Sequence, residues 1–174
     1  MRAFIAVEIP SEITERLSTV QRELPLGLKL VKPKAMHLTL KFLGEISEGK
    51  AKEASNSLDS LTFSPIPLTC RGLGVFPSRN LPRVLWAGIE SPGLVALHSK
   101  LEPKLLELGF AREDFTPHLT IARAKGKVEL KSILEKYSGE LFGECLIRSL
   151  HLKKSTLTPE GPVYEDVHSV SVKI

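Results

Sequence analysis

The stretch "PHLTIAR" (Pro117–Arg123) contains a histidine, a leucine, a threonine and an aliphatic residue in succession. The same order occurs eighty-one residues earlier, in "MHLTLKF" (Met36–Phe42). Each copy lies in an apolar run typical of a β-strand. One short motif of this kind arises readily by chance, but the two copies also share the leucine and the following aliphatic residue. The repeat therefore indicates a duplicated structural unit.

Strand geometry gives each copy two different faces. Alternate residues of a strand share one face of the sheet and lie about 6.5–7 Å apart. His37 and Thr39 are therefore expected on one face, with Leu38, Leu40 and Phe42 on the other. Each motif thus presents an imidazole and a hydroxyl side by side on an apolar support.

The second copy repeats this arrangement with His118 and Thr120 on one face and Leu119 and Ile121 on the other. Arg123 lies three residues after Thr120, so strict alternation places it on the opposite face. It can assist the motif only if the strand twists or ends there. A contact with phosphate or base and a plain surface arginine both stay open for Arg123.

The remaining pattern is one of strands and helices with short connections. Strands are expected at residues 3–9, 28–33, 37–45, 66–77, 83–90, 118–126, 144–154 and 163–173, and a turn joins the second of these to the third. Helices are expected from Ser11 as N-cap, from Ser47, from Ser91–Pro92 to Gly109, and near residues 130–137. A strand, a helix and a histidine-threonine strand recur in the same order. This recurrence suggests two similar α+β halves around a shared cleft.

The composition fits one globular domain. The chain has 174 residues, of which 25% are charged and 42% hydrophobic, and its formal net charge is +4. No apolar run approaches the length of a membrane span, and Glu8 and Pro10 interrupt the segment where a signal peptide needs its apolar core. We expect a cytoplasmic protein in which Cys70 and Cys145 are reduced. The modest positive charge suits a polyanionic partner. Amide side chains are few, which fits a thermophilic source: Gln21, Asn56 and Asn80.

Two facing motifs of this kind would support chemistry at phosphorus. Because histidine titrates near neutrality, one imidazole can accept a proton from a nucleophile while the other donates a proton to a leaving group. Two threonine hydroxyls and nearby cations can hold the non-bridging oxygens of a phosphate. The constellation needs neither a metal ion nor a covalent intermediate.

The sequence resembles the two-histidine (2H) phosphoesterase superfamily, which is defined by two HxTx motifs. Within it, the chain is similar to the RNA 2′,3′-cyclic phosphodiesterases, historically called 2′-5′ RNA ligases. The matching residues are His37-Leu38-Thr39-Leu40 and His118-Leu119-Thr120-Ile121, with the flanks "RAFIAVEIP", "GVFP", "RVLWAGI" and "STLTPEGPVYE". The resemblance covers essentially the whole chain. It implies an α+β fold: a two-lobed single domain (residues 1–174), each lobe an antiparallel sheet with flanking helices, related by a pseudo-twofold, with the motifs facing a central cleft.

The resemblance also implies a role for each motif residue. His37 corresponds to the proton donor and His118 to the proton acceptor, whereas Thr39, Thr120 and Arg123 correspond to substrate-binding positions. It implies no metal and no cofactor. The expected partners are RNA 3′ ends or tRNA fragments with a 2′,3′-cyclic phosphate, and nucleotides, bound by a monomer that does not enter a membrane.

Three classes of function compete. Hydrolysis of the cyclic phosphate to a 2′-phosphomonoester ranks first, and a 5′-hydroxyl in place of water would give 2′-5′ ligation in the same site. A catalytically weak module that binds RNA ends or nucleotides ranks second. A metal-dependent phosphatase ranks last, because the sequence has no HxH, DxD or carboxylate cluster suited to hard cations.

Other residues have a structural and a functional interpretation. His98, His151 and His168 lie outside any HxT motif, and we interpret them as structural. The single tryptophan, Trp86, fits core packing better than base stacking. Four lysines surround the first motif, and they fit a solvated face or an RNA path equally well: Lys29, Lys32, Lys34 and Lys41.

Overall fold

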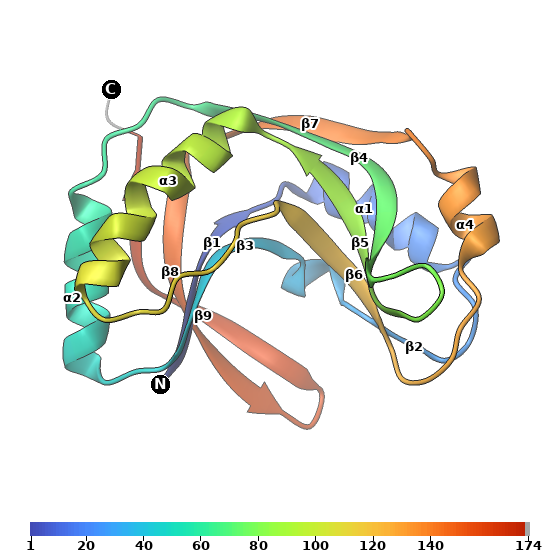
Figure 1. The fold of residues 1–174 in the computed structure, drawn as a ribbon, viewed down its shortest axis with the longest axis horizontal. Coiled ribbons are helices and arrows are strands. Elements are labelled where there is room, and N and C mark those ends of the chain that lie inside the picture. Colours follow the sequence, from blue (N-terminus) through green and yellow to red (C-terminus); the bar gives the residue numbers. More distant parts are fainter. Residues whose placement is uncertain (173–174) are drawn as a thin grey trace.

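Two antiparallel sheets form the two lobes of the molecule, seen in a computed structural model that describes residues 1–172 (Figure 1). The first sheet has the order β3-β1-β8-β9 and the second the order β2-β6-β5-β4-β7. The strands of the first are β1 (Arg2–Glu8), β3 (His37–Glu45), β8 (Ser149–Thr158) and β9 (Gly161–Ser171). Those of the second are β2 (Leu28–Leu30), β4 (Ile66–Pro77), β5 (Pro82–Glu90), β6 (His118–Ala124) and β7 (Leu141–Ile147). The α+β fold with two antiparallel sheets is confirmed.

Within residues 1–172, four α-helices and one short 3-10 helix accompany the sheets: α1 (Ser11–Gln21), η1 (Pro33–Ala35), α2 (Glu48–Asp59), α3 (Pro92–Glu107) and α4 (Lys131–Lys136). Helix α2 begins directly after Ser47, where a helix start was predicted, and Ser47 is its N-cap: its Oγ accepts a hydrogen bond from the Lys50 amide at 3.1 Å. The predicted N-cap Ser11 is wrong by one position. Pro10 occupies the cap, and Ser11 is the first helical residue.

Each lobe has its own hydrophobic core. Two helices, however, pack in the core of the other lobe from the strand that precedes them in the chain. Helix α1 follows β1 of the first sheet, yet its buried Ile13 and Leu17 pack in the core of the second sheet. Helix α3 follows β5 of the second sheet and packs Leu97 and Leu101 with α2 in the core of the first. The chain therefore crosses between the lobes repeatedly (Figure 1).

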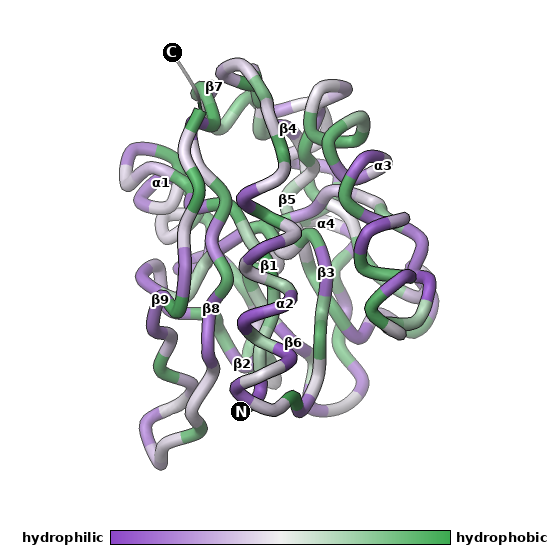
Figure 2. The backbone as a smooth tube through the Cα atoms, turned by 90° about the vertical axis from the view of Figure 1, so that its left-hand side faces the viewer, coloured by the Kyte–Doolittle hydropathy of each residue, from purple (hydrophilic) through white to green (hydrophobic). Residues whose placement is uncertain are grey.

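Strand β1 forms the centre of the first lobe. All five residues from Ala3 to Val7 are buried, because β1 is covered on both faces. Figure 2 shows this mostly hydrophobic strand behind α2, whose colouring is largely hydrophilic. The hairpin of β8 and β9 projects beyond the body of the protein in both Figure 1 and Figure 2.

Several strand assignments differ from the prediction. Of the segment 28–33 only Leu28–Leu30 is strand, and Pro33 begins η1 where a turn was expected. The strands β2 and β3 belong to different sheets, because β2 pairs with β6 and β3 pairs with β1. The segment 144–154 is not one strand, because it divides at Arg148 into β7 and β8, again in different sheets. The connection predicted at 155–162 is mostly strand, with only Pro159 and Glu160 in the turn. Lys173, the last residue of the predicted final strand, lies outside the described residues.

Candidate active site

The first histidine-threonine motif lies on β3, with the alternation that the sequence predicts. Leu38 and Leu40 are buried in the core of the first lobe, at 0% and 3% exposure. His37 and Thr39 are half-buried on the opposite face. The apolar residues thus anchor the strand while the imidazole and the hydroxyl face away from the core.

A β-bulge directly after this motif changes the direction of the next side chains. In the pairing with β1, Ile5 lies opposite Lys41 and Ala6 opposite Thr39, so Leu40 has no partner of its own. Consequently Lys41 points into the interior. Phe42 is 58% exposed and lies on the His37 face, not on the leucine face as predicted.

The second motif, on β6, contains the same irregularity. Leu119 and Ile121 are fully buried in the second core, and His118 and Thr120 are half-buried on the other face. The register shifts after Thr120, so that Thr120 pairs with Trp86 and Arg123 pairs with Val84. Because Val84 and Trp86 are two residues apart on β5, they share one face, and so do their partners. The bulge therefore returns the exposed Arg123 to the motif face. Arg123 and Phe42 occupy equivalent positions in the two halves.

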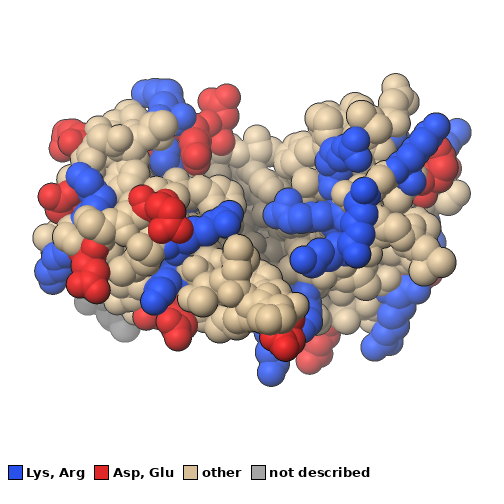
Figure 3. Space-filling model, turned by 90° about the horizontal axis from the view of Figure 1, so that it is seen from below, with Lys and Arg blue, Asp and Glu red and all other residues tan. Residues whose placement is uncertain are grey.

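The two strands that carry the motifs lie side by side between the lobes. Strands β3 and β6 contact each other although they belong to different sheets. Tyr164 of β9, in the first lobe, has its pKa raised by burial, and Arg123 of the second lobe and Arg2 oppose this shift. The charge of Arg123 therefore acts on a side chain of the other lobe. Figure 3 shows a hollow between the lobes, with basic side chains on both of its sides.

Two aromatic rings and one carbonyl hold the His37 side chain. Phe4 stacks on the imidazole with a centroid distance of 4.7 Å, and Tyr164 meets it edge-on at 4.8 Å. Burial lowers the pKa of His37 to about 4, Lys153 acts in the same direction, and a hydrogen bond to the Ala35 carbonyl opposes the shift. In the free protein His37 is therefore a neutral imidazole at pH 7.

His118 is held in a similar way. Its Nδ1 lies 2.7 Å from the Thr116 carbonyl oxygen. Because a carbonyl only accepts, Nδ1 carries the proton and the Nε2 of a neutral ring is free to accept one. Phe76 meets the ring edge-on at 5.1 Å, and Trp86 lies at 6.4 Å. Each of the two imidazoles thus has a hydrogen bond to the carbonyl two residues earlier in the chain.

Trp86 lies on the motif face of the second sheet rather than in the hydrophobic core. It pairs with Thr120 across the sheet, and its ring lies over Gly74. A Cβ at position 74 would approach the indole to 2.1 Å, so only glycine fits there. The favoured interpretation of Trp86, core packing, is therefore wrong, and base stacking stays a prediction for a ring that lies 6.4 Å from His118.

The other three histidines are apart from the motifs. His98 is buried in α3, and His168 lies 2.7 Å from the Asp59 carboxylate. His151 makes two side-chain hydrogen bonds: its Nδ1 lies 3.0 Å from Asp166 Oδ2, and its Nε2 lies 2.9 Å from Ser149 Oγ. Their structural interpretation agrees with these contacts.

One cluster of potential metal ligands was missed by the sequence search, because its members are far apart in the chain. Single ligand atoms of Glu8, His151 and Asp166 lie within 4.8 Å of one another. The Lys153 ammonium, however, bonds to Glu8 at 3.0 Å and to Asp166 at 2.7 Å. The two carboxylates thus already bind a cation, the Lys153 ammonium.

The four lysines around the first motif fall into two groups, three exposed and one buried. Lys29 pairs with Arg123 in register and is exposed on the same face of the second sheet. Lys32 and Lys34 are also exposed, and Lys32 Nζ reaches the Glu160 carbonyl at 3.3 Å. Lys41 is 2% exposed, so both the solvated face and the RNA path are wrong for this residue.

The family model described as LigT like Phosphoesterase matches residues 7–86 and 89–164. This chain belongs to the LigT-like phosphoesterase family. The matched residues include both histidine-threonine motifs, so the resemblance inferred from them is confirmed.

Relatives in this family align with almost the whole chain. A protein of Archaeoglobus fulgidus named RNA 2′,3′-cyclic phosphodiesterase is 42% identical over 172 residues, which are 96% of this chain and 98% of the relative. One of Methanocaldococcus jannaschii with the same name is 43% identical, covering 95% and 97%. The thermophilic source expected from the composition fits the organisms of such relatives, which include Thermus thermophilus.

Solved structures share the fold. The crystal structure of TT0787 of Thermus thermophilus has a TM-score of 0.86 at 31% identity, covering 99% of this chain and 98% of that one. Escherichia coli LigT in complex with 3′-AMP has a TM-score of 0.84 at 25% identity, with the same coverage. No helix within residues 1–172 is long and apolar enough to cross a membrane.

Proposed function

We propose that this protein hydrolyses the 2′,3′-cyclic phosphate at an RNA 3′ end to a 2′-phosphomonoester. The observation that carries the proposal is the pair of motif faces, His37 with Thr39 and His118 with Thr120, on two strands that contact each other between the lobes. The relatives named RNA 2′,3′-cyclic phosphodiesterase support the same reaction. Residues 1–174 act as one domain in this proposal.

His118 serves as the general base and His37 as the general acid. His118 Nε2 takes a proton from water, whose oxygen attacks phosphorus while the bond from phosphorus to the 3′-oxygen breaks. His37 gives its proton to the departing 3′-oxygen. The Thr116 carbonyl supports the first role, since it fixes the tautomer in which Nε2 is free.

Thr39, Thr120 and Arg123 bind the substrate. The two hydroxyls donate to the non-bridging phosphate oxygens, and the Arg123 guanidinium offsets their charge. The bulge that turns Arg123 towards this face supports its inclusion. Phe42, exposed at the equivalent position of the first half, offers an aromatic surface to a nucleobase.

The low pKa of His37 constrains how the acid acquires its proton. The phosphate is an anion, and an anion beside His37 favours the imidazolium form. Proton uptake by His37 therefore accompanies substrate binding. Ligation would follow the same path with a 5′-hydroxyl in place of water, but water at about 55 M competes unless the site excludes it.

The protonation of His37 can be followed directly, because its pKa is about 4 in the free protein. At pH 7 the free ring is neutral, so the proton that it donates must arrive when the anionic phosphate binds. We expect nitrogen NMR of the His37 ring to show a titration near pH 4 in the free protein and a protonated ring at pH 7 once a phosphate ester is bound. A His37 ring that stays neutral in the complex at pH 7 would contradict this protonation scheme.

Turnover without a metal tests the proposed function itself. The protein, treated exhaustively with EDTA, is incubated with an oligonucleotide that ends in a 2′,3′-cyclic phosphate. We expect full activity and a 2′-phosphate product, identified by phosphorus NMR or by an isomer-specific phosphatase. Binding without turnover would favour the RNA-end binding module. Activity lost on chelation and restored by a divalent ion would favour the metal-dependent phosphatase.

The physiological setting is part of the same proposal. RNA 3′ ends and tRNA fragments with a cyclic phosphate are the expected substrates, and the basic side chains beside the hollow support a polyanionic ligand (Figure 3). The structure of Escherichia coli LigT with 3′-AMP supports nucleotides as further ligands. We expect a monomer that acts in the cytoplasm.

A further inference from the structure

Lys41, the second residue after Thr39, is the most deeply buried charged side chain in residues 1–172, with 2% exposure. The bulge of β3 directs it away from the cleft and into the first lobe. Burying an ammonium group is costly unless its charge and its three donors are compensated. The surroundings of Lys41 provide this compensation.

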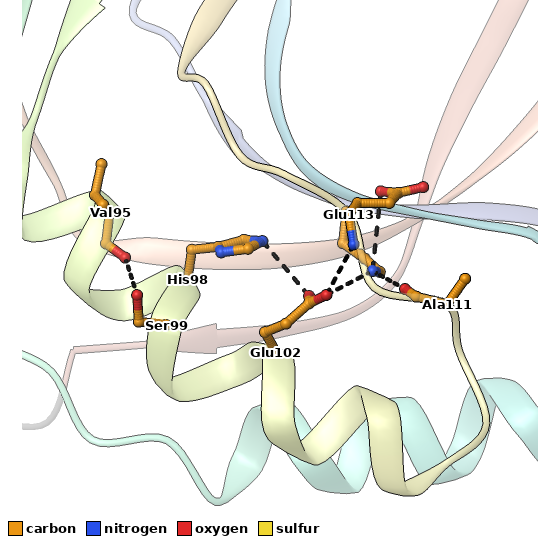
Figure 4. Close-up of polar contacts among 7 residues, drawn as sticks. Val95, His98, Ser99, Glu102, Ala111 and Glu113 are labelled. Atoms are coloured by element: carbon orange, nitrogen blue, oxygen red, sulfur yellow. Dashed lines mark hydrogen bonds and ion pairs between the residues drawn. The ribbon is translucent and has the colours of Figure 1, made fainter.

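The partners of Lys41 come from α3 and from the segment that follows it (Figure 4). Lys41 Nζ bonds to Glu102 Oε1 at 3.0 Å and to the Ala111 carbonyl, with Glu113 Oε2 at 3.9 Å. The same Glu102 oxygen accepts the Glu113 amide at 3.1 Å. One ammonium and one carboxylate therefore hold two backbone groups of this segment.

The segment at residues 108–117 has no regular secondary structure, and it leads directly to His118. Its Thr116 carbonyl fixes the His118 ring. Phe115, the preceding residue, stacks on His98 with a centroid distance of 4.5 Å, and His98 Nε2 lies 3.6 Å from Glu102 Oε2. The support of His118 is thus continuous with the Lys41–Glu102 pair.

The first motif has a different support. His37 follows η1, whose own backbone bonds order it: the Ala35 amide bonds to Lys32 O at 2.8 Å, and the Met36 amide to Pro33 O at 3.2 Å. The segment before His118 contains no such helix. Its order must come from tertiary contacts. Phe110 and Phe115 pack against the first core, and Lys41 and Glu102 supply the buried polar contacts.

We propose that Lys41 and Glu102 are positioning residues for His118. By fixing Ala111 and Glu113, they hold the Thr116 carbonyl where it orients the imidazole and selects its tautomer. The strand that carries His37 thereby also orients the other histidine through the side chain two residues beyond Thr39. The inference rests on the proposed function, because His118 is the base of that reaction.

The first test replaces Lys41 by methionine, which keeps most of the length of the side chain and removes its charge. A displacement of the base affects chemistry more than binding, so we expect kcat to fall roughly 10- to 100-fold with KM changed less than about threefold. Lys50→Met is the matched control. Lys50 Nζ donates to the Leu108 carbonyl at 2.9 Å, at the far end of the same segment. The control should keep the wild-type kcat, and an unchanged kcat in Lys41→Met would overturn the proposal.

A double variant separates positioning from stability. Lys41→Met leaves the Glu102 carboxylate without its cation, so the single variant also loses stability. Lys41→Met combined with Glu102→Leu removes both charges, and removing a buried ion pair as a unit restores stability. We expect the melting temperature to return towards wild type while kcat stays low, because the polar contacts that fix the Ala111 carbonyl and the Glu113 amide are then absent. Recovery of kcat together with the melting temperature would reduce the pair to a structural role.

Nitrogen NMR of the His118 ring gives a readout that needs no turnover. In the wild type the neutral ring should carry its proton on Nδ1, and in the double variant both tautomers should appear. If the wild type does not hydrolyse cyclic phosphates, the proposed function fails but this measurement still decides the inference. An unchanged His118 tautomer in the double variant would overturn it.

Discussion

Replacing His118 by alanine is expected to lower kcat/KM roughly 10²–10⁴-fold, because the attacking water then loses its general base. His37→Ala should lose activity in the same range, because the 3′-oxygen then leaves without a proton. Both rings are half-buried at the surface between the lobes and lie outside the hydrophobic cores. The fold should therefore persist in both variants, as circular dichroism and thermal unfolding would show.

His168→Ala is a matched control for these two variants. His168 is also a partly exposed histidine on a strand, but it pairs with Asp59 outside both motifs. Its replacement should leave kcat/KM unchanged. Wild-type activity in a folded His118→Ala protein would contradict the mechanism, whatever the effect of His37→Ala.

Local periodicity was sufficient to predict the two motif faces. The alternation of Leu38 and Leu40 with His37 and Thr39 depends only on strand geometry and on which side chains prefer burial. The cap at Ser47 is also a local feature, because its hydrogen bond spans three residues. Such features can be predicted from a short window of sequence.

The bulges could not be predicted, because a bulge is a property of two paired strands. Phe42 was placed on the wrong face, since nothing within "HLTLKF" shows that Leu40 lacks a partner in β1. For Arg123, alternation alone gave the wrong face, and only the register with β5 restores it. The equivalent irregularity in both halves positions both side chains at the site.

Sheet membership and buried polar contacts were missed for a related reason. Alternation identifies an extended segment but not its neighbour, so β7 and β8 were read as one strand although they lie in different sheets. Lys41 was read as part of a basic surface because Glu102, its partner, is 61 residues away in the chain. A lysine beside a motif looks the same in the sequence whether it meets solvent or a buried carboxylate.

A substrate with sulfur in place of the bridging 3′-oxygen tests the paired-histidine mechanism most directly. The alkoxide is a poor leaving group without a proton, whereas a thiolate, whose conjugate acid has a pKa of about 8.5, can leave unassisted. The general acid then becomes nearly redundant, but water still needs its base. The measurement compares kcat/KM of the wild type, His37→Ala and His118→Ala on the oxygen and sulfur substrates.

We expect the sulfur substrate to recover most of the roughly 10²–10⁴-fold loss in His37→Ala and almost none of the loss in His118→Ala. This result would establish His37 as the acid and His118 as the base. Recovery in His118→Ala instead would exchange the two roles. Recovery in neither variant would mean that the histidines bind the phosphate rather than transfer protons, which would contradict the account.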